Sequence, residues 1–103
     1  MARIKYLQTF YNDLDEALNY ISTVLLNPSA AVSLLNDVEQ AILKRSENPE
    51  AFEKYNSIKE RIYSYYRIYV NNFVIYYVVI PGDPPIMEVR RFLYNRRNKN
   101  RIV

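Results

Sequence analysis

The 103-residue chain contains no cysteine and no histidine, and Gly82 is its only glycine. Without cysteine, disulfide bonds and thiolate metal sites are excluded. Without histidine, the commonest general base and metal ligand is missing, together with every nucleophile that a histidine would activate. A glycine-rich phosphate loop is excluded as well. Any catalysis would therefore rest on arginine, lysine, tyrosine, glutamate or aspartate, and we expect no small-molecule cofactor.

Long apolar runs are also missing. No stretch reaches the ~18 apolar residues of a membrane span, and the start of the chain, MARIKYLQTF, lacks the apolar segment of a signal peptide. We therefore expect a cytoplasmic protein with no membrane partner. A chain of this length forms one domain, residues 1–103. Such a domain buries roughly 60–70% of the surface of its unfolded form, which is enough for a single hydrophobic core.

Charge and tyrosine are abundant but unevenly distributed. Residues 90–103 carry six positive charges and no acidic residue, whereas the rest of the chain carries eight basic and eleven acidic side chains. The modest net charge of +3 therefore hides a concentrated cationic end. Six of the eleven tyrosines fall between positions 63 and 77. A cationic end beside a tyrosine-lined segment suggests a surface for an anionic partner, and nucleic acid fits best.

The first quarter of the chain predicts a strand followed by a helix. Arg3–Leu7 is a short strand. Apolar residues then recur at helical spacing over Leu14–Leu25. Thr9 or Asn12 can cap this helix. Asn27-Pro28 ends it, because proline disfavours helical geometry at the residue before it.

A second helix follows at once. Ser29 can cap it, apolar residues over Ala30–Ile42 form its stripe, and Asn48-Pro49 stops it. The short connection implies an antiparallel helical hairpin. Residues 49–60 have mixed charge and no clear periodicity, so we expect a surface loop there.

The second half of the chain has the alternation of β-strands. From Arg61 the period changes to two, and Asn71-Asn72 is a two-residue hairpin turn because asparagine tolerates positive φ. The turn sets the register, pairing Val70 with Phe73, Ile68 with Ile75, and Arg67 with Tyr76. The face expected to pack on the helices holds Ile62, Tyr66, Ile68, Val70, Phe73, Ile75, Tyr77 and Val79. The other face, aromatic and cationic, holds Arg61, Tyr63, Tyr65, Arg67, Tyr69, Val74, Tyr76 and Val78.

Two further strands complete the expected sheet. Phe73–Ile80 is apolar on both faces, which favours a central strand. A stiff turn at residues 81–85 leads to a third strand, Ile86–Tyr94. The expected fold class is α+β: an N-terminal strand, an antiparallel helical hairpin, a three-stranded antiparallel meander and a short basic tail.

Arg67 is the first candidate for function. It lies in mid-strand on the face away from the helices, beside Tyr65, Tyr69 and Tyr76. An arginine held in a strand can present two parallel N–H groups to a phosphate, and the tyrosines can stack on bases. The structural alternative is that Arg67 stacks on Tyr76 and covers apolar surface, while the tyrosines simply line a sheet with one solvated face.

The end of the third strand supplies the other candidates. Arg90 and Arg91 are expected on opposite faces, with one near the functional surface and the other paired to an acidic residue of a helix. Tyr94, Arg96 and Arg97 lie close together in sequence, and two guanidinium groups can lower the pKa of a neighbouring phenol. This phenol could then exchange a proton while the arginines stabilise phosphate charge; alternatively, the segment is a solvated basic tail. Further basic or aromatic side chains expected to contact nucleic acid are Lys54, Lys59, Arg61, Tyr65, Tyr76, Arg90, Lys99 and Arg101.

A metal site is not expected. Asp13, Asp15 and Glu16 are clustered, but carboxylates are favoured near the start of a helix without any metal.

Two segments carry a resemblance to a known family. Tyr65–Val79, YYRIYVNNFVIYYVV, is similar to the family's aromatic hairpin, and Val89–Asn98, VRRFLYNRRN, is similar to its basic ending. The segment NPSAAVSLLNDVEQAI is similar to the family's second helix. On these residues and on the order of elements, the chain resembles the RelE/ParE toxins of bacterial type II toxin–antitoxin modules over essentially its whole length.

The resemblance implies a toxin that a cognate antitoxin protein holds inactive. RelE-like members cleave mRNA on the ribosome without metal, by activating the ribose 2′-OH, whereas ParE-like members are not nucleases and inhibit DNA gyrase. Val74 stands where many RelE-like nucleases have arginine, and Tyr94 stands where several have histidine. Both departures slightly favour the ParE-like branch.

Three functions follow from the resemblance. The first is a ribosome-dependent mRNA endonuclease, in which Arg67 and Arg96 hold the scissile phosphate and Tyr94 assists proton transfer, with Arg97 completing the minimal set. The second is a gyrase inhibitor with no chemistry of its own. The third is a degenerate member that retains only antitoxin binding. All three predict a disordered, acidic or amphipathic antitoxin that folds onto the domain and contacts the cationic face and the sheet edge or helices.

Overall fold

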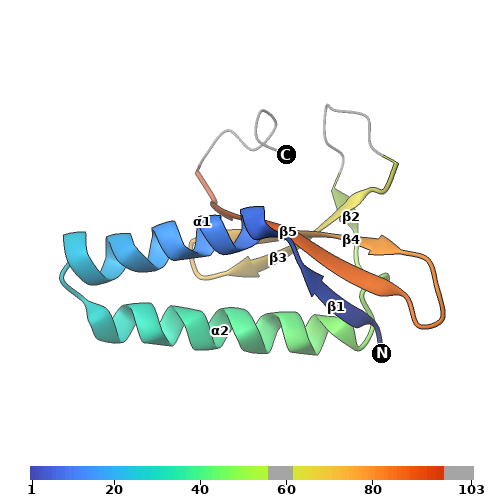
Figure 1. Cartoon of the computed structure of the whole chain (residues 1–103), viewed down its shortest axis with the longest axis horizontal. Coiled ribbons are helices and arrows are strands. Elements are labelled where there is room, and N and C mark those ends of the chain that lie inside the picture. Colours follow the sequence, from blue (N-terminus) through green and yellow to red (C-terminus); the bar gives the residue numbers. More distant parts are fainter. Residues whose placement is uncertain (56–61, 97–103) are drawn as a thin grey trace.

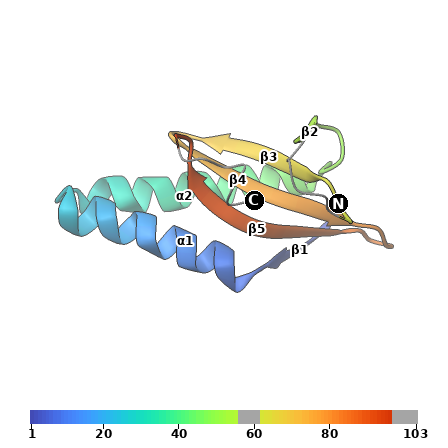
Figure 2. The same ribbon diagram turned by 90° about the horizontal axis from the view of Figure 1, so that it is seen from above.

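The structure of the chain is a computed structural model that describes residues 1–55 and 62–96. Its elements are β1 (Arg3–Tyr6), α1 (Gln8–Asn19), the π-helical η1 (Tyr20–Val24), α2 (Pro28–Ser46), β2 (Lys54–Tyr55), β3 (Tyr65–Val70), β4 (Phe73–Ile80) and β5 (Ile86–Tyr94). The two helices run antiparallel and cover one face of the sheet (Figures 1 and 2). The predicted α+β fold, with a strand, a helical hairpin and a meander, is confirmed.

Both helices start differently from the sequence prediction. The second ends close to the predicted stop, at Ser46, whereas α1 ends at Asn19 and η1 at Val24, ahead of Asn27-Pro28. Leu7, not Thr9 or Asn12, is the N-cap of α1, and no side chain caps it. The reason is that the Leu7 N–H still donates to the Val89 carbonyl at 3.0 Å, so the helix begins directly where the strand pairing ends. At α2 the cap is Asn27 instead of Ser29, and its side chain accepts from the Ala30 N–H at 3.2 Å. Proline occupies the first helical position, which moves the cap one residue before it.

The tip of the helical hairpin extends beyond the end of the sheet (Figures 1 and 2). The helix α1 continues into the π-helical segment η1, and Leu26 reverses the chain with a positive φ of 52°. Val24, Leu25 and Leu26 at this tip are 62%, 56% and 81% exposed. The hairpin therefore ends in apolar residues that do not pack into the core.

The sheet has the order β1-β5-β4-β3-β2, so the doubly apolar β4 is central, as predicted. The strand β1 pairs with β5 in parallel, and the other neighbours pair antiparallel. The hairpin register is confirmed, with Val70 opposite Phe73, Ile68 opposite Ile75, and Arg67 opposite Tyr76. Asn71 has a φ of 52°, the left-handed geometry that asparagine tolerates in this turn.

Two sequence predictions about the strands are wrong. Ile62 was expected on the helix-packed face, yet it is 93% exposed in a bend, because β3 starts only at Tyr65. Lys54–Tyr55, expected within a loop, pairs with the start of β3 as the edge strand β2. The remainder of that predicted loop, residues 56–60, and Arg61 lie outside the described residues.

Both faces of the sheet carry buried side chains. The helix-side core joins residues of α1 and α2 to Tyr66, Ile68, Val70, Ile75, Tyr77, Met87, Val89 and Phe92. Within it, the stacked rings of Phe73 and Phe92 have centroids 4.6 Å apart, an arrangement worth about 0.5–1.5 kcal/mol beyond area burial. The other face holds a smaller group, here called the opposite-face cluster: Tyr65, Val74, Tyr76, Val78 and Leu93. The expected solvated face is therefore wrong at these positions, although Tyr69 is 57% exposed.

Candidate functional site

Arg67 lies in the middle of β3, on the face of the sheet away from the helices. Its neighbours Tyr66 and Ile68 belong to the helix-side core, and alternation along the strand directs Arg67 to the other side. It is partly buried, and its guanidinium carbon lies 5.7 Å from the centroid of the Tyr69 ring. The arginine thus covers the ring of Tyr69, whereas the structural alternative named Tyr76, and part of its side chain remains accessible.

Tyr65 and Tyr76 are buried, and this limits their use as a stacking platform. They are 5% and 0% exposed, and their rings meet edge to face with centroids 5.8 Å apart. A base can stack only on a ring with an accessible face. In this arrangement the two tyrosines stabilise the opposite-face cluster and offer no open ring to a base.

Arg90 is held beside the same cluster. Its Nε donates to Glu88 Oε1 at 2.9 Å, and its guanidinium carbon lies 5.8 Å from the Tyr65 ring centroid. Burial lowers the pKa of Arg90, but hydrogen bonding to Tyr65 and Glu88 raises it by more than burial lowers it. The pKa is therefore raised overall. Arg90 is a fixed, permanently charged group on this side of the sheet.

Arg91 instead binds the first helix. Its Nε donates to Asp13 Oδ2 at 2.7 Å and its Nη2 to Asp13 Oδ1 at 3.1 Å, which confirms the predicted pairing of one arginine with a helical carboxylate. The hydrogen bond to Asp13 raises the pKa of Arg91. Arg90 and Arg91 were expected to alternate strictly between the two faces of the sheet. This alternation fails, because a β-bulge interrupts the pairing of β5 with Tyr76 and Tyr77 of β4.

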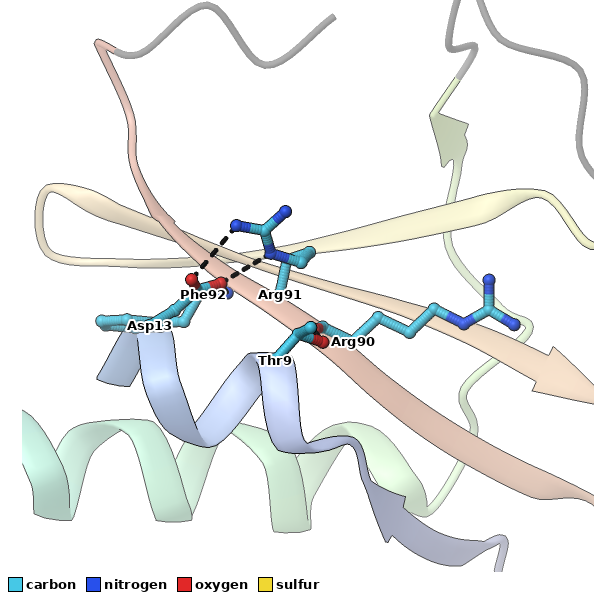
Figure 3. Close-up of polar contacts among 5 residues, drawn as sticks. All are labelled: Thr9, Asp13, Arg90, Arg91 and Phe92. Carbon is cyan, nitrogen blue, oxygen red and sulfur yellow. Dashed lines mark hydrogen bonds and ion pairs between the residues drawn. The ribbon is translucent and has the colours of Figure 1, made fainter. Parts of the chain in front are cut away.

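The same helix satisfies backbone groups along β5 (Figure 3). The Thr9 hydroxyl donates to the Arg90 carbonyl at 2.8 Å, and the Phe92 N–H donates to Asp13 Oδ2 at 3.0 Å. The partner strand β1 pairs with β5 only as far as Val89. Side chains of α1 therefore continue the hydrogen bonding of the β5 edge where β1 ends. We call this arrangement the α1 clamp.

Tyr94 lies on the helix side of the sheet. It pairs with Phe73, and the two rings meet edge to face with centroids 5.7 Å apart. Phe73 packs on the helix-side core, whereas Arg67 projects from the other face. Tyr94 is 40% exposed. The structure therefore does not bring Arg67 and Tyr94 together.

The remaining candidates are placed as follows. Arg96 is exposed in the turn after β5, and Lys54 is exposed on β2. Lys59, Arg61, Arg97, Lys99 and Arg101 lie outside the described residues. Among residues 1–55 and 62–96, no group of three or more acidic side chains is arranged to hold a metal ion. Neither helix in that part of the chain is long and apolar enough to cross a membrane.

The sequence reasoning missed a groove between the helical hairpin and the end of the sheet, here called the tip groove. Its helical wall consists of Ala17, Tyr20, Ile21 and Leu25, and its sheet wall of Asn72, Phe73, Phe92 and Tyr94; Asp13 and Glu16 also line it. Its volume is about 710 Å³. One signal for this groove was present in the sequence: the apolar run Val24-Leu25-Leu26. It lies at the end of the helical hairpin, and its side chains are not needed to fill the core.

Comparison with known proteins agrees with this fold. Residues 4–99 match the family model of the ParE toxin of the type II toxin–antitoxin system parDE. The structure is similar to the chromosomal ParDE toxin–antitoxin system from P. aeruginosa, with a TM-score of 0.69 and 14% sequence identity, covering 91% of this chain and 96% of that chain. No curated protein matches the sequence. The chain belongs to the ParE toxin family of type II toxin–antitoxin systems.

Proposed function

We propose that this protein is a toxin that inhibits DNA gyrase by binding it, and that it has no nuclease activity. Membership of the ParE family supports this choice. The observation that carries it is the separation of Arg67 and Tyr94, which project from opposite faces of the sheet.

The separation weakens the nuclease hypothesis for a geometric reason. A general acid or base must lie within hydrogen-bond reach, about 2.6–3.2 Å, of the proton that it transfers. The groups that hold the same phosphate must also contact it directly. Arg67 and Tyr94 cannot meet one phosphate while a sheet lies between their side chains.

The second candidate is a RelE-like, ribosome-dependent mRNA endonuclease. The observation in its favour is that Arg67 keeps an accessible part on the face where Arg90 also lies beside Tyr65. Such a site would use Arg67 with Arg96 or Arg97 and would leave Tyr94 out. Basic side chains would then hold ribosomal RNA through its phosphates.

Both candidates require the same regulation. A cognate antitoxin would bind the toxin and neutralise it in the cytoplasm, where gyrase, ribosomes and mRNA are found. A third candidate, a degenerate member, would keep this antitoxin binding and lose toxicity.

The deciding experiment is controlled expression in a bacterial host, with mapping of mRNA 5′ ends and a DNA supercoiling assay with purified gyrase. The wild type is compared with Arg67→Ala and with Lys5→Ala, a control in the exposed part of β1. We expect growth arrest and loss of supercoiling with all three proteins and no new 5′ ends. New ends in phase with codons that vanish in Arg67→Ala would instead establish the nuclease. Absence of growth arrest by the folded wild type would identify the degenerate member.

Substitution of Tyr94 separates the same hypotheses from a second direction. If the Tyr94 phenol transfers no proton, Tyr94→Phe should arrest growth as strongly as the wild type, within about twofold. A proton-transfer role typically contributes 10²–10⁴-fold to a rate, so its loss would be plain. A strong loss of toxicity in Tyr94→Phe would contradict the proposed function.

A further inference from the structure

The outer edge of β3 is paired along only part of its length. In the described part of the chain, β2 is the strand beside this edge, and it pairs with Tyr65 and Tyr66 alone. In a two-residue hairpin the residues that flank the turn exchange hydrogen bonds, so Val70 directs its backbone groups toward β4. Arg67 and Tyr69, at the alternating positions, therefore direct theirs toward the outer edge. Such outward groups are a template for pairing with another strand.

A set of contacts centred on Arg45, here called the Arg45 latch, closes part of this edge. Arg45 lies in the last turn of α2, and its Nη1 donates to the Arg67 carbonyl at 2.9 Å and to the Tyr77 hydroxyl at 3.0 Å. Its guanidinium carbon lies 3.5 Å from the centroid of the Phe52 ring. The Tyr77 hydroxyl donates in turn to the Pro49 carbonyl at 2.7 Å. The latch therefore holds the segment after α2 and occupies an outward acceptor of β3.

The Arg45 latch can open without disturbing the core. Phe52, whose ring stacks on the guanidinium, is 49% exposed, and Arg45 is only partly buried. A cation stacked on a ring at an exposed site is held weakly, because solvent competes for it. The Tyr77 hydroxyl keeps its bond to the Pro49 carbonyl when Arg45 moves away. Opening therefore frees the Arg67 carbonyl and leaves the buried contacts in place.

A second copy of this chain fits the opened edge. In an antiparallel pairing with two-fold symmetry about Ile68, Arg67 of one copy lies opposite Tyr69 of the other. These are the residues with outward backbone groups, so each facing pair exchanges two hydrogen bonds. The side chains match as well, because each arginine meets a tyrosine ring and not the other arginine. Within one copy the Arg67 guanidinium carbon already lies 5.7 Å from the Tyr69 ring centroid. A two-fold contact uses the same surface on both copies, so this edge is sufficient.

We propose that the β3 edge is a self-association surface, on which two copies of this chain pair antiparallel about Ile68, and that the Arg45 latch keeps this edge closed. Arg45 takes the Arg67 carbonyl, which is one of the two outward acceptors in each copy. With the latch closed, the pairing loses half of its hydrogen bonds, so the two arrangements compete. The inference is independent of the proposed function, because it involves neither gyrase nor RNA.

The test compares the wild type with Arg45→Met, which removes the latch and keeps an unbranched side chain. Lys44→Met is the matched control, since it removes the same charge from the neighbouring, exposed position of α2. Sedimentation velocity over a range of concentrations measures the mass. The wild type and Lys44→Met should sediment as single chains, and Arg45→Met should associate at least about tenfold more tightly, because the pairing regains its hydrogen bonds. Phe52→Ala should act in the same direction by less, and its exposed position makes it the test if Arg45→Met does not fold.

Amide hydrogen exchange locates the contact. In Arg45→Met the Tyr69 N–H should exchange more slowly as the concentration rises, whereas the Ile68 N–H, already directed toward β4, should not change. Adding Tyr69→Pro removes that N–H, which an edge strand tolerates, and should restore single chains. A folded Arg45→Met with the mass of one chain at every concentration would overturn the proposal. Equal association of the wild type or Lys44→Met, or protection confined to Val24–Leu26, would overturn it as well.

Discussion

The two faces of the sheet are made from alternate residues of the same strands, yet they differ in what surrounds them. The face under α1 and α2 holds the larger core and ends in the tip groove, with Tyr94 in its wall. The opposite face holds a small, tyrosine-rich cluster with Arg67 and Arg90 beside it. The comparison shows that candidate residues of suitable chemistry on neighbouring strands need not belong to one site. Arg67 and Tyr94 are candidates of the same chemistry, but the sheet separates them.

The largest effect is expected where α1 joins the edge of the sheet. Asp13→Ala removes the acceptor of both Arg91 and the Phe92 N–H, and Asp13 and Arg91 are only 13% and 24% exposed. Breaking a largely buried ion pair from one side is costly, so the free energy of unfolding should fall by about 3 kcal/mol. Urea unfolding measures it. Asp15→Ala, at an exposed acid of the same helix, should change stability by less than about 0.5 kcal/mol. Similar losses in both variants would mean that the α1 clamp contributes little.

A smaller effect is expected inside the helix-side core. The Tyr77 hydroxyl donates to the Pro49 carbonyl at 2.7 Å and accepts from Arg45 Nη1 at 3.0 Å. Tyr77→Phe leaves both groups without this partner, so we expect a loss of about 1.5 kcal/mol in thermal or urea unfolding. Tyr69→Phe, on the exposed part of the opposite face, should be nearly neutral. A Tyr69→Phe loss as large as that of Tyr77→Phe would reverse the ranking of the two faces.

Alkaline pH should test the helix-side tyrosines without mutation. Burial raises the pKa of Tyr77, although Arg45 partly offsets the shift, and burial also raises the pKa of Tyr6. An unfolded tyrosine ionises near pH ~10, so the stability from these groups is present below that pH and is lost as the pH rises toward the folded pKa values. The free energy of unfolding should therefore decline above pH ~10, and Tyr77→Phe should make the decline less steep. An unchanged slope in Tyr77→Phe would assign the decline to other groups.

The smallest effect is expected at the exposed ion pair between β1 and β5. Lys5 Nζ lies 3.8 Å from Glu88 Oε2, and the Lys5 side chain is 61% exposed. Solvent weakens such a pair, so Lys5→Ala should cost less than about 0.5 kcal/mol in urea unfolding. Glu88 keeps its closer partner Arg90 at 2.9 Å. A loss above about 1 kcal/mol would show that the three charges act as a network.

Local patterns determined the elements of this protein. The turn at Asn71-Asn72 sets the register of β3 and β4, because a two-residue loop allows only one pairing of its flanking strands. Pro28 opens α2 and Pro49 follows its end, and apolar residues on both faces identify β4 as the central strand. The start of β3 escaped prediction because alternation continues into residues that the fold leaves outside the sheet.

Only the tertiary structure decided which of these elements share a surface. The bond between Asp13 and Arg91 joins residues 78 positions apart, and no local period reports such a contact. The same holds for the burial of Tyr65 and Tyr76, which depends on packing over the sheet, and for the tip groove, whose walls come from the helical hairpin and from strands in the second half of the chain. Sequence alone therefore nominated Arg67 and Tyr94 as candidates for one site, whereas packing decided that they lie on different faces.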